Sequence, residues 1–355
     1  MAHACRSRGA SRDPGKILAG PEHLPRLFGT AVYARYPVQT LVTDVLSNRA
    51  DPISNRSQSM FTRAALLLLT AVPFAALGAQ TSTSGSSTVF RGEIQRGAWL
   101  RVRGLKGSIE VRETTGNTAV VYARRRFNPR ASGDITFETR RDGANVTVCA
   151  IWEETRRCDA NGYDSRGGRH DTMGLVDFVV ELPKGIKLVA ATGNGTVHVR
   201  NAGEEVNASS GNGEVSVLGA AGRVSASSGN GDIEVTGANG AVRASSGNGG
   251  IRVTTSRGPV SASTGNGRIE AQMTSLDSDG DMEFSSGNGS IVVTFPSNLS
   301  AMVEANIPAK NFTTDFPLEL PARWNSNRIR GTIGQGGRRI RLSTGNGSVS
   351  IRKGR

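Results

Sequence analysis

The sequence is poor in aromatic residues, in cysteine and in histidine. Phe, Trp and Tyr together make up 5% of the 355 residues, so a core built from large aromatic side chains is not expected. Glycine is abundant instead, with 45 residues. Because glycine adopts backbone conformations that side chains forbid, many tight turns are expected.

Residues that carry out catalysis are also scarce. Beyond residue 80 the histidines are His170 and His198, far apart in the sequence, and His198 falls at an outward strand position. The serines are expected in turns, without a base beside them. Outward carboxylates such as Glu234 and Glu270 lie on a flat wall without a cleft. No catalytic residues and no cofactor are therefore predicted.

A short apolar run has the features of an export signal. Residues 60–63 form a basic start, residues 64–77 are mostly apolar, and residues 76–79 offer the small side chains that signal peptidase reads. A run of 14 residues is short for a membrane span and typical of a signal-peptide core. Residues 60–79 are predicted to be a signal peptide, so the mature protein from about Gln80 would have no transmembrane segment.

Residues 1–59 precede this signal and show no apolar periodicity. They are predicted to be disordered. Either translation starts at Met60 or the leader is unusually long, and the first interpretation is favoured. Both interpretations predict an exported protein, located in the periplasm, at the cell surface or outside the cell.

The cysteines support the same compartment. Cys5 lies in the upstream stretch, which leaves Cys149 and Cys158 in the exported chain. An even number of cysteines in an exported protein favours a disulfide. Zinc is improbable because no third or fourth ligand follows at a suitable spacing.

An internal repeat dominates the second half of the chain. The triplet Gly-Asn-Gly recurs, and its first five copies are spaced by 18 residues. The asparagines predicted to form structural turns are Asn194, Asn212, Asn230, Asn248, Asn266, Asn288 and Asn346. Each repeat divides into two nine-residue halves, a turn and a strand with period-2 alternation. Two strands per 18-residue rung predict a narrow solenoid.

The alternation places Val or Ile inward on one wall and mostly Val and Ala on the other. Stacking rungs about 4.8 Å apart would bury these faces. Glycine and asparagine tolerate positive φ, so the triplet is expected to reverse the chain, with the asparagines stacked into an amide ladder.

Metal binding by the repeat is not expected. The residue after Gly-Asn-Gly is Gly250 in one rung and Arg268 in another, which excludes a roll of bound calcium. The segment 277–281 places three aspartates around a glycine. It lacks the downstream bidentate Glu of an EF-hand loop, so a solvated bulge is expected. No metal site is predicted.

The flanking regions differ from the repeat. Residues 80–182 contain six strand candidates and are predicted to form irregular first rungs or a β-rich N-terminal cap. Within them, residues 153–174 are polar and loop-like. Residues 183–355 are predicted to be the solenoid repeat domain, with an inserted segment near 296–340 that covers its C-terminal side.

Several segments in this order resemble the bacterial putative-adhesin family of β-strand repeat proteins, a domain-of-unknown-function family. Besides the Gly-Asn-Gly rungs, the matching pieces are Leu182–Leu188, Thr314–Pro317, Gly331–Gly337 and Leu342–Ile351. The resemblance covers roughly residues 90–352. It implies an all-β, right-handed parallel β-solenoid (β-helix) at the cell envelope, an adhesin label and no catalytic residues.

Three classes of function remain open. The favoured one is an exported binding module or adhesin that contacts an envelope glycan or a surface protein. A structural or envelope-stress accessory protein is the alternative, and a polysaccharide-active β-helix enzyme is less favoured. The basic runs Arg124–Arg126 and Arg338–Arg341 could suggest nucleic acid, but export and the few aromatics argue against it.

Overall fold

Short strands separated by glycine turns form nearly all of the described chain. The computed structural model describes residues 85–126, 134–166, 174–277, 279–322 and 326–354. The predicted signal peptide, the upstream stretch 1–59 and His170 lie outside these residues. No helix among the described residues is long and apolar enough to cross a membrane.

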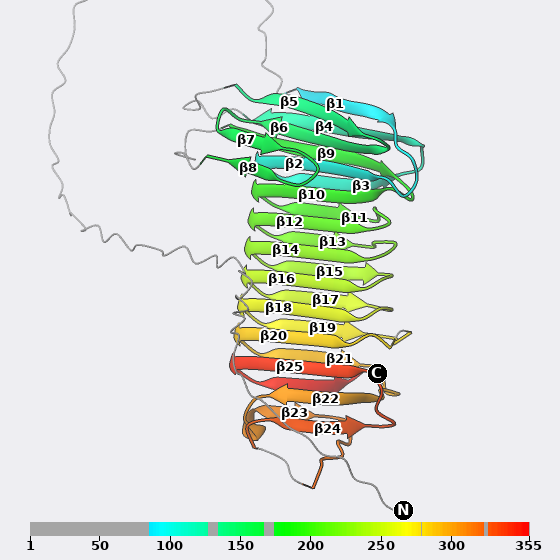
Figure 1. The fold of residues 1–355 in the computed structure, drawn as a ribbon, viewed down its shortest axis with the longest axis vertical. Coiled ribbons are helices and arrows are strands. Elements are labelled where there is room, and N and C mark those ends of the chain that lie inside the picture. The colour runs from blue at the N-terminus through cyan, green and yellow to red at the C-terminus, as the bar shows by residue number, and fades with distance from the viewer. Residues whose placement is uncertain (1–84, 127–133, 167–173, 278, 323–325, 355) are drawn as a thin grey trace, which may run out of the picture. The chain divides into compact units, whose positions relative to one another are not determined.

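Two sheets of 12 strands each contain all of these strands except one hairpin (Figure 1). The first sheet runs, in spatial order, β1 (Ser86–Glu93), β4 (Thr118–Arg126), β9 (Leu175–Pro183), β3 (Ile109–Thr114), β11 (Val197–Arg200), β13 (Val215–Leu218), β15 (Ile233–Ala238), β17 (Ile251–Thr255), β19 (Ile269–Met273), β21 (Ile291–Phe295), β26 (Val349–Lys353) and β23 (Phe312–Thr314).

The second sheet faces the first across the core. It runs β24 (Ile329–Ile333), β22 (Ala301–Asn306), β25 (Arg339–Asn346), β20 (Met282–Asn288), β18 (Val260–Asn266), β16 (Val242–Asn248), β14 (Val224–Asn230), β12 (Val206–Asn212), β10 (Lys187–Asn194), β2 (Trp99–Lys106), β6 (Asn145–Ile151) and β5 (Thr136–Asp142). The separate hairpin is β7 (Thr155–Cys158) with β8 (Tyr163–Ser165).

Each repeat gives one strand to each sheet, and equivalent strands pair in parallel. Val206 lies opposite Val224 in the second sheet, and Val215 lies opposite Ile233 in the first, both at an offset of 18 residues. The predicted parallel β-solenoid is confirmed. The predicted inward residues are buried as well, since Val215 and Val224 are fully buried between the sheets.

A column of inward hydroxyl groups, which the sequence analysis placed in turns, lies at the end of each second-sheet strand. Each of these serines or threonines donates a hydrogen bond to the glycine carbonyl one rung back, as Ser228 does to Gly213 at 2.8 Å. The column comprises Thr192, Ser210, Ser228, Ser246, Thr264, Ser286 and Thr344. These bonds satisfy buried polar groups and tie neighbouring rungs together.

The seven Gly-Asn-Gly asparagines form a continuous amide ladder. Each Nδ2 from Asn212 onward donates to the Oδ1 of the preceding copy at 2.6–2.8 Å. The expected positive φ is wrong for these asparagines, because the only described non-glycine residue with positive φ is Asn201. In five of the seven triplets the second glycine takes that conformation instead, as at Gly231 with φ +156°.

The first complete rung is separated in sequence from the others. β2 and β3 stack directly on β10 and β11, with Trp99 opposite Lys187 and Ile109 opposite Val197. The chain between them forms β4 to β9, which pair at this end of the two sheets. Antiparallel pairs β1–β4 and β5–β6 form the outermost strands there.

The opposite end is built from the segment between β21 and β25. The last copy of the repeat, β25 and β26, stacks directly on β20 and β21. β22 and β23 then pair with the free edges of β25 and β26, and β24 adds an antiparallel edge strand. The strands β22, β23 and β24 therefore lie beyond the last rung.

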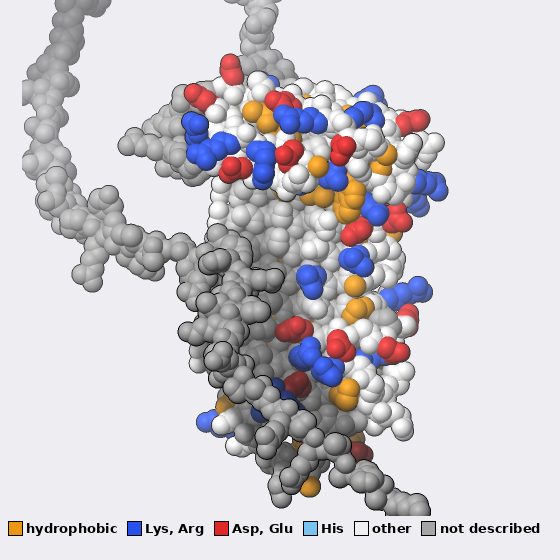
Figure 2. All heavy atoms as spheres, in the orientation of Figure 1, with side chains coloured by type: hydrophobic (Ala, Val, Ile, Leu, Met, Phe, Trp, Pro, Cys, Tyr) orange, Lys and Arg blue, Asp and Glu red, His pale blue; other side chains and the backbone are white. Residues whose placement is uncertain are grey.

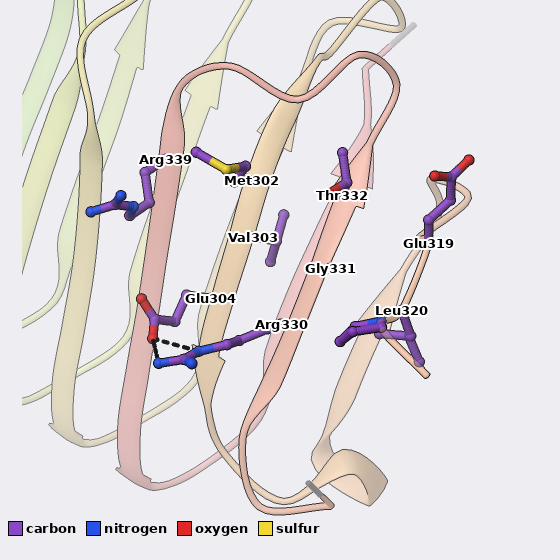
Figure 3. Close-up of a pocket in the computed structure, with 10 residues that line it drawn as sticks. Met302, Val303, Glu304, Glu319, Leu320, Arg330, Gly331, Thr332 and Arg339 are labelled. Atoms are coloured by element: carbon purple, nitrogen blue, oxygen red, sulfur yellow. Dashed lines mark hydrogen bonds and ion pairs between the residues drawn. The ribbon is translucent and has the colours of Figure 1, made fainter. Parts of the chain in front are cut away.

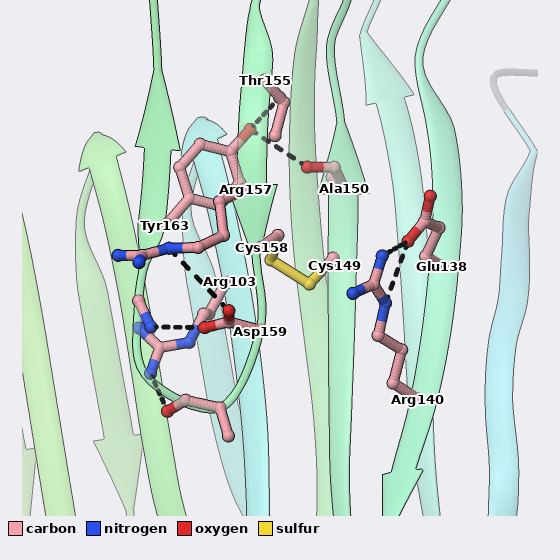
Figure 4. Close-up of a disulfide and its surroundings, with 12 residues drawn as sticks. Arg103, Glu138, Arg140, Cys149, Ala150, Thr155, Arg157, Cys158, Asp159 and Tyr163 are labelled. Atoms are coloured by element: carbon pink, nitrogen blue, oxygen red, sulfur yellow. Dashed lines mark hydrogen bonds and ion pairs between the residues drawn. A yellow bond between two sulfur atoms is a disulfide. The ribbon is translucent and has the colours of Figure 1, made fainter.

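Residues 155–165 form a β-hairpin, which corrects their description as part of a loop. The hairpin β7–β8 lies on the outer face of β6, where a disulfide joins Cys149 to Cys158 (Figure 4). The Tyr163 hydroxyl donates to the Ala150 carbonyl at 3.2 Å. A polar hairpin this short shows little apolar periodicity, so covalent and hydrogen-bond anchors determine its position.

The disulfide predicted from the cysteine count is thus confirmed, and its loss has an expected cost. The double substitution Cys149→Ala/Cys158→Ala should lower the free energy of unfolding by about 2–3 kcal/mol, since a loop of this length constrains the unfolded chain by that amount. Denaturant melts of the variant and of the wild type with and without reductant measure it. Equal stability of the oxidised and reduced wild type would contradict the assignment.

Candidate functional site

The outer face of the second sheet presents short polar side chains in register along the rungs. Ser209, Ser227 and Ser245 follow one another at the second outward position of their strands. Ser263, Ser285 and Ser343 continue the same column. Next to it runs a column of exposed glycines, followed by the amide ladder. Because these side chains are short, this part of the face is flat and lined with hydroxyl and amide groups.

Charged side chains gather at the ends of the stack. Figure 2 shows Lys, Arg, Asp and Glu side chains crowded over the N-terminal strands, with fewer over the repeated rungs. At the N-terminal end, Arg103 Nη2 donates to the Ala160 carbonyl of the β7–β8 turn at 3.0 Å (Figure 4). Burial lowers the pKa of Arg103, and burial raises the pKa of Tyr163 to about 12. Tyr163 therefore keeps its proton at neutral pH.

A groove of about 680 Å³ lies at the C-terminal end of the same face (Figure 3). Its floor is the outer surface of β22 and β24, and Leu320 and Pro321 line one side. Met302 and Leu320 are 41% and 43% exposed, two of the three large hydrophobic side chains exposed among the described residues. Arg330 and Arg339 add positive charge. The groove offers both apolar contact and guanidinium groups.

Glu304 organises the arginines of this groove. Its Oε1 lies 2.6 Å from Arg328 Nη2 and 2.8 Å from Arg330 Nη2, and its Oε2 lies 3.9 Å from Arg341 Nε. Hydrogen bonds from Arg330, aided by those from Arg328, lower the pKa of Glu304. Glu304 is therefore ionised at neutral pH and joins three strands, which makes it unsuited to donating a proton.

The three aspartates of segment 277–281 pair with arginines and a backbone amide. Asp277 lies 3.4 Å from Arg257, and Asp279 lies 3.3 Å from Arg338. Asp281 accepts from the Arg339 backbone amide at 3.0 Å. Within the described ranges, no group of three or more His, Cys, Asp or Glu is placed to hold a metal ion. The sequence analysis treated this acidic segment and the basic run 338–341 separately, although they meet in the fold.

One row of residues corrects the expectation that no serine lies beside a base. Glu110, His198 and Ser216 occupy the same outward position on β3, β11 and β13. No hydrogen bond is found among these three residues, whereas a working triad links nucleophile, base and carboxylate. The backbone amides around them are part of a continuous parallel sheet, which leaves no donor pair for an oxyanion. We therefore assign no catalytic role to these three residues.

Glu234, Arg252 and Glu270 occupy one column of the first sheet, as the 18-residue period predicts. Arg252 Nη2 lies 3.1 Å from Glu270 Oε2, and no ion pair of Arg252 with Glu234 is found among the described residues. Arg268 also pairs with Glu270, at 2.8 Å.

Reversing the middle charge of this column should destabilise the protein slightly. Arg252→Glu places three like charges in a row and is expected to cost about 0.5–1 kcal/mol at low salt, less at high salt. Adding Glu234→Arg and Glu270→Arg restores alternation and should recover most of the loss. Thermal melts at two salt concentrations measure both effects, and a triple variant no better than the single one would contradict the register.

One comparison with known protein families gives a match. The family model described as "Toastrack DUF4097" matches residues 173–352. A search of curated proteins found no match.

Two solved structures share a low overall likeness. One is described as a putative adhesin from Bacteroides fragilis NCTC 9343, 11% identical, with a TM-score of 0.36, covering 76% of this chain and 98% of that one. The other is described as a putative cell adhesion protein from Clostridium sporogenes ATCC 15579, 11% identical, with a TM-score of 0.21, covering 76% of this chain and 100% of that one. At these values neither likeness bears on what this chain binds. The family match, which spans half of the chain, does settle membership: the chain belongs to the Toastrack DUF4097 family.

Proposed function

We propose that the protein is an exported, non-catalytic binding module that presents the outer face of its second sheet to a glycan of the cell envelope. The observation that carries this proposal is the flat column of serines, in register from Ser209 to Ser343 and flanked by the amide ladder. Hydroxyl and amide groups at a regular spacing match the hydroxyl groups of an extended polysaccharide. The adhesin names of the two solved structures are compatible with this function and do not support it independently.

A glycan-array measurement tests the proposal. The purified protein should bind a subset of polysaccharides, and binding should weaken when Ser227 and Ser245 are both replaced by bulky residues. A protein that binds no glycan on the array, while remaining folded by circular dichroism, would favour the structural accessory role instead.

Export is part of the proposal and rests on residues 60–79 of the sequence. The mature N-terminus is expected near Gln80, because the small residues 76–79 suit signal peptidase. Mass spectrometry of the protein recovered outside the cytoplasm measures this directly. Peptides from residues 1–59 in that material would contradict the assignment.

A further inference from the structure

The second sheet's outer face has a step at its N-terminal end. The lower level is formed by β2 and β10, where Trp99 lies opposite Lys187. The raised level is the hairpin β7–β8, held on β6 by the disulfide and contacted by Arg103 of β2 (Figure 4). Trp99, Arg101 and Arg103 alternate along β2 on this outer face and are partly exposed.

Two cations lie against the indole ring at this step. Arg101 Cζ is 5.8 Å and Lys187 Nζ is 5.6 Å from the centre of the Trp99 ring. Lys187 and Arg157 each form an ion pair, with Glu205 and Asp159, both at 3.8 Å, whereas no ion pair of Arg101 or Arg103 is found among the described residues. The step therefore carries an excess of positive charge beside an aromatic ring.

The guanidinium groups at the step are incompletely satisfied. Arg101 Nη1 and Arg103 Nε are buried atoms with no hydrogen-bond partner among the described residues. The pKa of Arg103 is lowered by burial and, next, by the charge of Arg101. Buried charged donors without acceptors are costly, so a movement of either guanidinium that brings these atoms to an acceptor at the surface would be favoured.

The surroundings suit a sugar ring better than a compact anion. Val189 and Ala191 occupy the outward positions beside Arg101 and Arg103 on β10, and both are short. The serine column is in register with Ala191 and Arg103 rather than with Trp99. A chain lying along that column therefore passes Arg103 and comes close to Arg101, and a guanidinium binds a carboxylate through two parallel hydrogen bonds.

We propose that Trp99, Arg101 and Lys187 form a subsite for one acidic sugar residue of a polysaccharide that continues along the serine column. The carboxylate or sulfate of the sugar accepts hydrogen bonds from Arg101 and Lys187, which Trp99 holds in place through its ring. Arg103 adds positive charge at the foot of the hairpin. This inference rests on the proposed function and assigns it a class of ligand and an anchoring position.

Titration calorimetry with defined oligosaccharides tests the subsite. The probes are a hexasaccharide of galacturonic acid, a sulfated galactose hexasaccharide and a neutral galactose hexasaccharide, which separate carboxylate, sulfate and uncharged ligands. Trp99→Ala and Arg101→Gln should each lower the affinity for the acidic hexasaccharide by at least about tenfold, which is the loss expected for one charge-assisted or aromatic contact. Trp99→Phe, which keeps an aromatic face, should recover part of that loss.

A matched control lies on the outer face of the first sheet. Arg200 is an exposed outward arginine on β11 of the first sheet, away from the proposed binding face, so Arg200→Gln should change the affinity by less than about twofold. Melting curves of all variants verify folding. If Trp99→Ala and Arg101→Gln leave the affinity for the acidic hexasaccharide unchanged, the subsite is wrong, while the proposed function stands. If the neutral hexasaccharide binds as tightly as the acidic ones, the ligand is not specifically an acidic sugar. If none of the three hexasaccharides binds, the subsite is wrong, and the glycan array then decides whether the proposed function holds.

Discussion

Val235→Asp is expected to lower the free energy of unfolding by roughly 3–5 kcal/mol, the cost of leaving a charge buried without a partner. Val235 is fully buried on β15, where its neighbours in register are Val217 and Val253. Both neighbours are apolar, so a carboxylate at this position has no donor to accept from. Urea denaturation of the purified variant measures the loss.

The adjacent residue provides the control. Glu234 is exposed on the outer face of the same strand, so Glu234→Ala should stay within about 0.5 kcal/mol of the wild type. Similar shifts for the two variants would mean that the inward and outward faces of β15 are wrongly assigned.

Gly231→Ala is expected to cost about 2–4 kcal/mol, because it combines a backbone clash with an unfavourable conformation. A Cβ at this position would lie 2.3 Å from the Gly213 carbonyl oxygen of the preceding rung, and φ is +156°. The three nearest atoms are all backbone atoms of Gly213 and Glu214 in the preceding rung, so the clash is relieved only if one rung moves away from the other.

Gly116→Ala is the matched substitution in open space. The nearest atom to its Cβ would be Thr114 Oγ1 at 4.0 Å, and its φ is not in the positive range. We expect a change within about 0.5 kcal/mol, measured in the same melts. A Gly231→Ala protein as stable as Gly116→Ala would show that the rungs are not as closely stacked as the structure places them.

The regular part of the fold could be predicted because its information is local and repeated. Period-2 alternation identifies the inward face of each strand, and the 18-residue spacing sets which residues meet across strands, as Glu234 and Arg252 do. The hydrogen bonds from the inward serine hydroxyls to the glycine carbonyls were not predicted. Alternation alone marks Ser228 as inward, but polarity suggested a turn.

The ends of the stack could not be predicted because their contacts are long-range and unrepeated. Trp99 meets Lys187 across a large insertion, and no motif marks the two segments as neighbours. The same holds for Arg338 and Asp279, which lie in separate charge runs of the sequence. The candidate subsite and the C-terminal groove lie at these ends, so the sequence alone could indicate a binding wall without locating an anchor on it.

The proposed binding wall can be tested by placing the same change on each of the two outer faces. Ser227→Glu/Ser245→Glu puts two carboxylates on the second sheet at β14 and β16, and Thr236→Glu/Thr254→Glu puts two on the first sheet at β15 and β17 of the same rungs. We predict that the first pair weakens glycan binding by at least about tenfold, through lost contacts and added negative charge, while the second pair has little effect. Equal effects of the two pairs, or a larger effect of the first-sheet pair, would contradict the assignment of the second sheet's outer face as the binding surface.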